Sequence, residues 1–228
     1  MDTAGNLARS KFGAGTSDTQ AEVLDPRLEY MKVTVAQSQF LIFKAATLES
    51  TPEQAAIQVW YTPAGEVIRL YENGRLHSTA GILQADWRDA RSTGAPGWQQ
   101  VASHGLAQYQ RVRDVMPGYH SGLRDQVTVQ AVTPPSQVST LQAMPPHDLQ
   151  WFEEASELLD QNRVDQTEES AELDPVHTAL PVARFAVAPG TERVVYSEQC
   201  LSTSICLTLQ VWPPSAPRAQ SASDSLSP

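Results

Sequence analysis

Hydrophobic and polar residues alternate along residues 55–83, and turn-forming residues divide this stretch into three short segments. One face of the alternation carries Ile57, Val59, Tyr61, Ile68, Leu70 and Leu76. Residues 63–65 (Pro-Ala-Gly) separate the first two segments. Asn73 and Gly74 separate the last two, and they predict a type I′ hairpin turn because both tolerate positive φ. The pattern predicts a three-stranded antiparallel meander, and the rest of the chain must cover one of its faces.

Further runs of alternating or β-branched residues predict strands on both sides of the meander. The predicted strands cover residues 33–35, 39–47, 98–104, 106–116, 126–132, 182–187, 193–197 and 205–212. Residues 39–47 are apolar on both faces, which suggests a strand that is buried on two sides. The expected fold is therefore mainly β, an antiparallel, meander-rich sandwich or open barrel.

Four segments lack a clear strand pattern. Residues 3–12 predict a short N-terminal helix, and Asp25 and Pro26 predict a turn of helix, because proline is tolerated at the first helical position. Residues 85–98 are polar and rich in Gly and Pro, which favours a loop with one helical turn. Residues 148–159 fit a helix, from their Glu, Ala and Leu content, and they also fit a strand.

These elements divide the chain into three parts. Residues 1–20 are expected to form an N-terminal helix and linker, and residues 21–212 a β domain. Residues 213–228 are rich in Pro, Ser and Ala, so a disordered tail is expected there. Within the β domain, residues 160–178 are acidic and poor in apolar side chains, which predicts a mobile surface excursion.

The chain of 228 residues carries a formal net charge of −10, and its pI is about 4.9. Such a charge repels nucleic-acid backbones and anionic lipid headgroups. Arg88 and Arg91, and likewise Arg111 and Arg113, read as ordinary solvated pairs rather than as a basic patch. No apolar run approaches the length of a membrane span. Nucleic acid is therefore not an expected partner.

The two cysteines, Cys200 and Cys206, lie in the segment SEQCLSTSIC. Their spacing suits a small disulfide loop across a strand turn in an oxidising compartment, and two reduced, packed thiols are the alternative. A zinc site is disfavoured, because neither a second cysteine pair nor a nearby histidine completes it. Residues 2–15 lack the apolar core of a signal peptide, which leaves a cytoplasmic protein or a processed form open.

The sequence contains no spacing typical of a catalytic, metal or phosphate-binding site. The histidines are His77, His104, His120, His147 and His177, and they form no metal-binding motif. The glycines within 13–15 and 94–97 lack the context of a phosphate-binding loop. The adjacent pairs at 153–154 and 168–169 are glutamates, which read as solvated faces because neighbouring side chains point apart. No catalytic residue, metal or cofactor is predicted, and an enzyme is not expected.

Three tryptophans, Trp60, Trp87 and Trp98, lie in or beside the predicted meander. Tryptophan rings stack well on saccharides, so the three rings are candidates for a glycan-binding site. Tryptophan is also highly buried on average in folded domains. This tendency favours core packing, and glycan binding is kept as the alternative.

The segment EVIRLYENGRLHSTAGI and the Asp-Trp that follows it resemble the signature stretch of the YjbF/GfcB family of lipoproteins. These proteins are encoded in bacterial exopolysaccharide and group 4 capsule loci. The matching positions are Leu70, Gly74, Arg75, Leu76, Thr79, Gly81, Ile82 and Asp86. Residues 26–31 and 40–46 resemble the entry segment and the first core strand of the family.

A third family stretch is similar to residues 184–201. The matching positions are Arg184, Phe185, Ser197, Gln199 and Leu201. Ala186 stands where the family has a tryptophan. The resemblance spans residues 2–212 in order, whereas residues 160–178 and the tail after Trp212 depart from the family pattern.

The resemblance implies an all-β, sandwich-like or open-barrel domain, and it favours a strand within residues 148–157. It also implies a periplasmic domain that is tethered to the outer membrane through a lipidated N-terminal cysteine. No cysteine precedes Cys200, so we expect that the signal and lipobox were removed or that the start was assigned downstream. A soluble relative is the alternative. A periplasmic location would also favour the Cys200–Cys206 disulfide.

Three functions are compatible with these observations. The first is a non-enzymatic accessory protein of exopolysaccharide or capsule export and assembly, with other export proteins or polysaccharide as partners. The second is a glycan-binding module that uses exposed aromatic rings. The third is a polysaccharide-modifying enzyme whose acid pair is hidden by the sequence spacing. The family resemblance and the lack of a catalytic motif favour the first.

Overall fold

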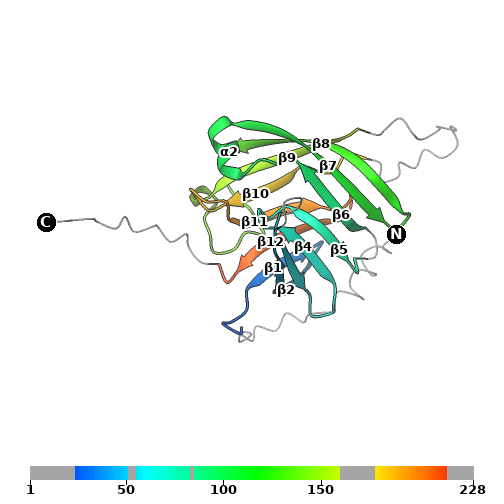
Figure 1. Ribbon diagram of the computed structural model, residues 1–228. Helices are drawn as coiled ribbons and strands as arrows, with labels where there is room; N and C mark the ends of the chain where they lie inside the picture. Colours follow the sequence, from blue (N-terminus) through cyan, green and yellow to red (C-terminus); the bar gives the residue numbers. More distant parts are fainter. Residues whose placement is uncertain (1–23, 51–54, 83–84, 160–177, 215–228) are drawn as a thin grey trace.

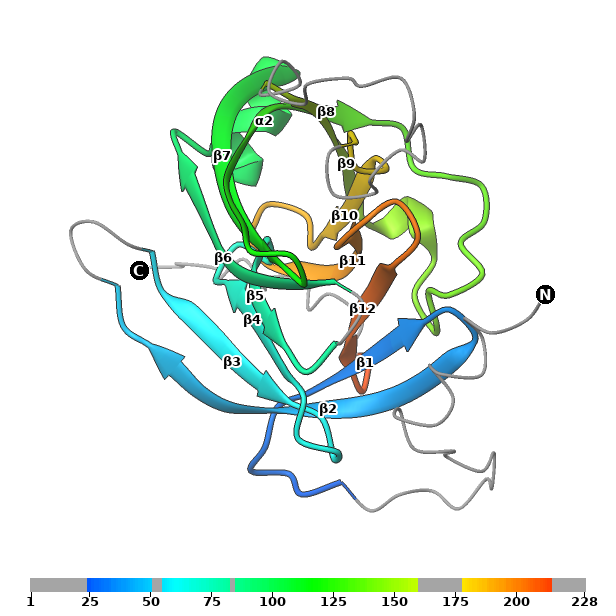
Figure 2. The ribbon, with the colours of Figure 1, turned by 90° about the vertical axis from the view of Figure 1, so that its right-hand side faces the viewer.

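The computed structural model describes residues 24–50, 55–82, 85–159 and 178–214. Within these ranges twelve strands form one sheet in the order β5-β4-β3-β2-β1-β12-β11-β10-β9-β8-β7-β6. The strands are β1 (Tyr30–Val35), β2 (Ser38–Leu48), β3 (Ile57–Tyr61), β4 (Val67–Tyr71), β5 (Leu76–Ala80), β6 (Asp86–Thr93), β7 (Leu106–Met116), β8 (His120–Val132), β9 (Gln150–Leu158), β10 (Ala183–Val187), β11 (Val194–Cys200) and β12 (Cys206–Trp212). The sheet curls so that its two outermost strands, β5 and β6, lie side by side (Figure 1, Figure 2). The predicted mainly β fold is confirmed, in its open-barrel form.

The predicted meander forms β3, β4 and β5, which pair in chain order. Its second turn differs from the prediction. The loop contains three residues, 72–74, and the amide of Gly74 donates to the carbonyl of Tyr71 at 2.8 Å. Gly74 has a φ of +79°, whereas Asn73 is not among the residues with positive φ. The turn is therefore a three-residue hairpin loop with a left-handed glycine, and the type I′ prediction is wrong.

Residues 98–104, predicted as a strand, form the helix α2 (Trp98–His104). Trp98 and Val101 are its buried residues, and side chains three positions apart share one face of a helix. Gly105 ends the helix with a φ of +81°, a conformation that glycine adopts readily. The alternation that suggested a strand is therefore overridden by the packing of a short helix of about two turns.

Residues 85–98, predicted as a loop, contain strand β6. Its only apolar side chains, Trp87 and Ala90, are both buried, and its polar side chains are exposed or half-buried. A bulge between Trp87 and Asp89 interrupts the pairing with β7. The strand was missed because the bulge breaks the two-residue period on which the prediction depended.

Residues 148–159, which fitted either a helix or a strand, form strand β9 after the 3-10 turn η1 (Pro146–Asp148). The strand implied by the family resemblance is thus confirmed.

Asp25 begins a turn that is closed when the amide of Leu28 donates to its carbonyl at 3.0 Å. This turn does not continue as a helix, because extended backbone follows and β1 begins at Tyr30.

Three predictions concern segments outside the described residues. They are the N-terminal helix and linker at 1–20, the acidic excursion predicted at 160–178, of which 160–177 lie outside, and the tail predicted at 213–228, of which 215–228 lie outside. Within the described part of the chain, α2 is seven residues long. No helix there has the length and apolar character needed to cross a membrane.

The buried side chains gather in three clusters, and one of them fastens α2 to the sheet. The Trp98 ring packs on Phe152 of β9 and Phe185 of β10, with centroid distances of 5.1 and 4.7 Å. The Trp98 indole N–H donates to the carbonyl of Asn73 at 2.9 Å. The helix is thereby connected to the β4–β5 turn as well as to strands β9 and β10.

Candidate functional site

Strands β5 and β6 are the two ends of the sheet, and no backbone ladder joins them within the described residues. Hydrogen bonds that involve side chains close the seam between them instead. The Asp86 carboxylate accepts a hydrogen bond from the Thr79 hydroxyl at 2.9 Å. It also accepts the amides of Gly81 and Ile82 at 2.9 and 3.0 Å. The amide of Trp87 donates to the Thr79 hydroxyl oxygen at 3.1 Å. Four positions of the family-like motif therefore hold the barrel closed.

A second set of contacts crosses the same seam. The Tyr71 hydroxyl donates to the carbonyl of Ala90 at 2.6 Å, and its ring meets His77 edge-on at 5.1 Å between centroids. His77 Nε2 lies 3.2 Å from an oxygen of Asp89. Burial lowers the pKa of His77, although Asp89 opposes the shift. Burial raises the pKa of Tyr71 to about 12, which keeps its hydroxyl protonated as a donor.

A buried ion pair joins the β4–β5 turn to β9. Arg75 Nε donates to Glu154 Oε1 at 2.7 Å, and both side chains are 4% exposed. The Tyr109 hydroxyl donates to the other Glu154 oxygen at 3.0 Å, and burial beside this carboxylate raises the pKa of Tyr109. Arg75 Nη1 donates to the carbonyl of Pro96 at 3.1 Å. The guanidinium lies 4.0 Å from the ring centroid of Trp98, a cation–π contact.

A second charged group lies on β7 and β8. Asp125 accepts hydrogen bonds from Arg113 at 2.7 and 3.1 Å and from Arg111 at 2.9 Å. Arg113 and Asp125 are each 1% exposed, and Arg111 is 13% exposed. Both guanidinium groups lie near the Trp87 ring, 5.1 and 5.6 Å from its centroid. The prediction that Arg111 and Arg113 form a solvated pair is therefore wrong.

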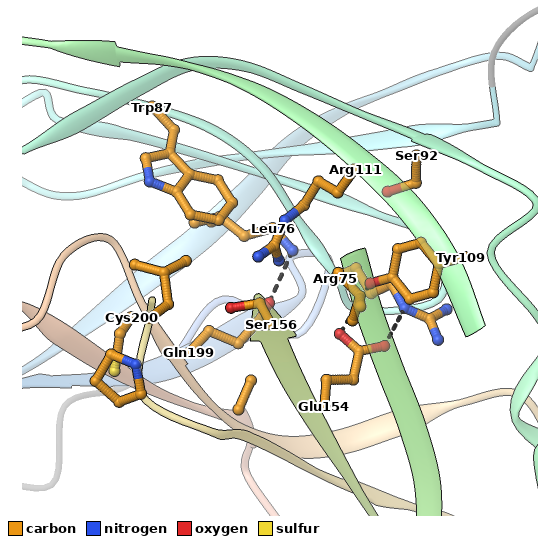
Figure 3. Close-up of a pocket in the computed structure, with 14 residues that line it drawn as sticks. Arg75, Leu76, Trp87, Ser92, Tyr109, Arg111, Glu154, Ser156, Gln199 and Cys200 are labelled. Atoms are coloured by element: carbon orange, nitrogen blue, oxygen red, sulfur yellow. Dashed lines mark hydrogen bonds and ion pairs between the residues drawn. The ribbon is translucent and has the colours of Figure 1, made fainter. Parts of the chain in front are cut away.

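Arg75 and Glu154 of the first group and Arg111 of the second line a cavity among strands β5 to β11 (Figure 3). Its buried residues include Arg75, Leu76, Trp87, Tyr109, Glu154 and Gln199. Half-buried or exposed residues, Ser92, Arg111, Ser156, Pro181 and Ala183, form its rim. The cavity volume is about 20 Å³, which gives room for about one or two water molecules. A small polar group fits this space, and a whole sugar ring does not.

The three tryptophans considered for glycan binding are all buried. Trp60, Trp87 and Trp98 are 3%, 2% and 0% exposed. The indole N–H of Trp87 donates to the carbonyl of Leu201 at 2.9 Å. None of the three rings offers an exposed face for stacking on a saccharide. Their burial agrees with the core-packing interpretation and argues against the stacking site.

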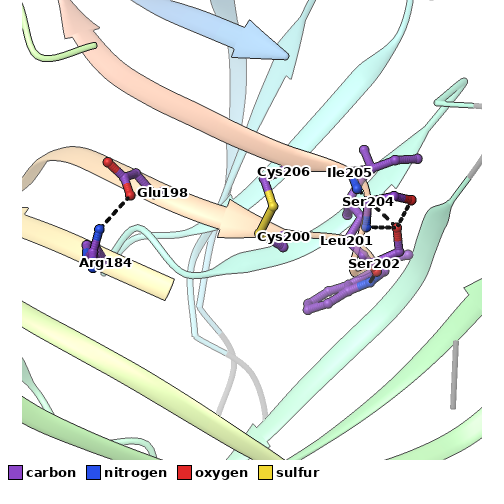
Figure 4. The surroundings of a disulfide bond; sticks show 9 residues. Arg184, Glu198, Cys200, Leu201, Ser202, Ser204, Ile205 and Cys206 are labelled. Atoms are coloured by element: carbon purple, nitrogen blue, oxygen red, sulfur yellow. Dashed lines mark hydrogen bonds and ion pairs between the residues drawn. A yellow bond between two sulfur atoms is a disulfide. The ribbon is translucent and has the colours of Figure 1, made fainter. Parts of the chain in front are cut away.

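Cys200 and Cys206 are joined by a disulfide and face each other across the β11–β12 ladder (Figure 4). The turn between them is ordered by Ser202, whose hydroxyl oxygen accepts the amides of Ser204 and Ile205 at 3.3 and 3.2 Å. Cys200 also lines the cavity. The cross-link thus fixes one wall of the cavity at the end of β11.

The buried charges of the interior were not predicted from the sequence. The adjacent glutamates on β9 read as a solvated pair, yet only Glu153 faces outward, where it contacts the half-exposed Arg184. Glu154 has the strand parity of Phe152 and Leu158, which are buried. A charged residue at an apolar strand position was the available signal, but its use required that residues 148–159 be known as a strand.

No metal centre is found among the described residues, where no three His, Cys, Asp or Glu side chains are grouped to hold an ion. Four of the five histidines lie in described strands, turns or helices, and His77 is the buried one. His177 lies outside the described ranges. The chemistry that the structure does gather is instead the arginine-rich lining of the cavity.

No protein-family model matches the chain, and no curated protein matches it. The fold is similar to the crystal structure of the hypothetical lipoprotein YmcC from Escherichia coli (K12), with a TM-score of 0.58 and 13% sequence identity. The similarity covers 82% of this chain and 87% of that chain. At this identity the likeness concerns the fold alone. The chain therefore has a fold that is also found in a protein described as a hypothetical lipoprotein.

Proposed function

We propose that this protein is a non-enzymatic accessory protein of exopolysaccharide or capsule export and assembly. In its full-length form it would be a periplasmic lipoprotein anchored to the outer membrane. The observation that carries the proposal is the fold shared with YmcC, a hypothetical lipoprotein, across most of both chains. The ordered resemblance to the YjbF/GfcB family supplies the link to polysaccharide loci.

The geometry of the site supports a binding or scaffold role rather than catalysis. Glycoside hydrolysis uses a pair of carboxyl groups that flank the scissile bond. The two buried carboxylates near the cavity, Glu154 and Asp125, are instead each held by arginine at 2.7 Å. The disulfide between Cys200 and Cys206 is in keeping with an oxidising compartment such as the periplasm.

The proposal is tested by deleting the gene from the bacterium that encodes it. Polysaccharide released into the medium and polysaccharide retained on cells are then measured separately. We expect one or both amounts to fall and to be restored by the wild-type gene. Unchanged release and retention would contradict a role in export or assembly.

The same cultures test the non-enzymatic part of the proposal. An accessory protein changes the amount or location of the polymer but not its covalent structure. Linkage and composition analysis of the residual polysaccharide should therefore match that of the wild type. A changed linkage, chain length or substituent would instead indicate a polysaccharide-modifying enzyme.

A further inference from the structure

One donor of the buried network has no acceptor. Arg75 forms hydrogen bonds through Nε and Nη1, but its Nη2 is buried and has no hydrogen-bond partner among the described residues. The side chain is 4% exposed and lines the cavity. A buried donor without an acceptor is unfavourable, and a charged donor especially so. Arg75 therefore presents an unused donor at the cavity.

The charges around the cavity do not cancel. Two arginines of its lining, Arg75 and Arg111, accompany one carboxylate, Glu154, which leaves one positive charge in excess. The Arg113–Asp125 pair beside them adds no net charge. This excess occurs inside a chain whose overall net charge is −10. A ligand group with a single negative charge would balance the site. A dianion such as phosphate would reverse the sign of the imbalance, and a neutral group would leave it.

Size and access narrow the ligand further. The cavity volume of about 20 Å³ is comparable to one small polar group. Ser156 and Ala183 at its rim are half-buried, and Pro181 is exposed, so the cavity reaches the surface on that side. A ligand can therefore insert one anionic group while the remainder stays at the rim.

From these observations we infer that the cavity binds the carboxylate of an acidic ligand, which Arg75 and Arg111 hold by charge-assisted hydrogen bonds. Planar guanidinium groups match carboxylates in geometry as well as charge. The remainder of the ligand lies against the rim at Ser92, Ser156 and Pro181. The inference goes beyond the proposed export function and depends only on the cavity.

The inference is tested by calorimetric titration of the protein with sodium glucuronate, sodium acetate, glucose and inorganic phosphate at constant ionic strength. Glucuronate and acetate share the carboxylate, and glucose is the neutral counterpart of glucuronate. We expect glucuronate to bind and glucose not to bind. Tighter binding of glucuronate than of acetate would show that the sugar ring contacts the rim, whereas equal affinity would show recognition of the carboxylate alone.

Variants locate the binding. Arg111→Met removes one positive charge from the cavity while the Arg113–Asp125 pair is kept, and it should weaken glucuronate binding at least about tenfold. Arg184→Met is the matched control, because it removes the same charge from the outer face, where Arg184 is 50% exposed. Ser156→Leu fills the rim without changing a charge and should also reduce binding. Circular dichroism and thermal unfolding verify that each variant is folded.

Three results would overturn the inference. The first is that neither glucuronate nor acetate binds, which would mean that Arg75 Nη2 is satisfied by water only. The second is that phosphate or glucose binds as tightly as glucuronate. The third is that Arg184→Met weakens binding as much as Arg111→Met does, which would indicate general attraction rather than this cavity. The indole N–H signals of Trp87 and Trp98 report the site by NMR, because both rings contact its arginines.

Discussion

Replacement of Glu154 by glutamine tests the interior ion pair with almost no change of shape. The carboxylate accepts Arg75 Nε at 2.7 Å and the Tyr109 hydroxyl at 3.0 Å. Glutamine keeps one acceptor oxygen but removes the negative charge. Arg75, 4% exposed, would then be a buried guanidinium without a counter-ion.

The expected cost is large because removing one partner of a buried ion pair leaves an uncompensated charge. Such changes typically cost about 3–5 kcal/mol. The free energy of unfolding of Glu154→Gln should therefore fall by about 3 kcal/mol or more. Glu153→Gln is the matched control on the same strand. Its partner Arg184 is half-exposed, so a loss below about 1 kcal/mol is expected there.

Urea titration followed by tryptophan fluorescence and circular dichroism measures both variants at pH 7. The double variant Arg75→Met/Glu154→Gln removes the unpaired charge and should recover part of the lost stability. If Glu154→Gln and Glu153→Gln were equally stable to within about 0.5 kcal/mol, the reasoning about a desolvated pair would be refuted.

Three further predictions concern the seam and the cross-link. Asp86→Ala should lower the free energy of unfolding by about 2 kcal/mol, because a charged acceptor of three hydrogen bonds is lost. Hydrogen exchange of the Gly81 amide should accelerate, and an unchanged exchange rate would contradict this prediction. Acidification from about pH 7.5 to about pH 5.5 should lower the free energy of unfolding of the wild type more than that of His77→Gln. Urea titrations at the two pH values measure both decreases, and equal decreases would contradict the prediction. Burial lowers the folded-state pKa of His77 below 6.5, so its contribution is complete above pH 6.5 and is lost as the pH falls through the folded pKa. Reduction of the Cys200–Cys206 bond should lower the free energy of unfolding by about 2 kcal/mol, which is the loop-closure entropy expected for so short a loop. Urea titrations with and without dithiothreitol measure this difference, and equal stabilities would contradict the prediction.

The strands could be predicted where local pattern and long-range pairing agree. Residues 106–116 and 205–212 alternate cleanly. The first segment forms β7, and all but the first residue of the second forms β12. Prediction failed where tertiary contacts decide the structure. Trp98 packs on two aromatic rings from distant strands and thereby makes a helix of a segment with strand character.

The interior charges could not be predicted from neighbouring residues alone. Arg75 follows a turn and Glu154 follows another glutamate, and both contexts are typical of the surface. They are 79 residues apart and meet only because the sheet curls. The motif that resembles the family was easier to recognise, because Thr79, Gly81 and Asp86 interact within one short stretch. The residues that close the seam are therefore close together in the sequence.

The proposed role in polysaccharide export is tested most directly by identifying what the protein contacts in the cell. The full-length tagged protein would be cross-linked in living cells and purified from envelope membranes, with mass spectrometry of bound protein and glycan. We predict recovery of export proteins encoded in the same locus, from the membrane fraction and not from cells lacking the tag. Recovery of the protein without any envelope partner, in the soluble cytoplasmic fraction, would contradict the account.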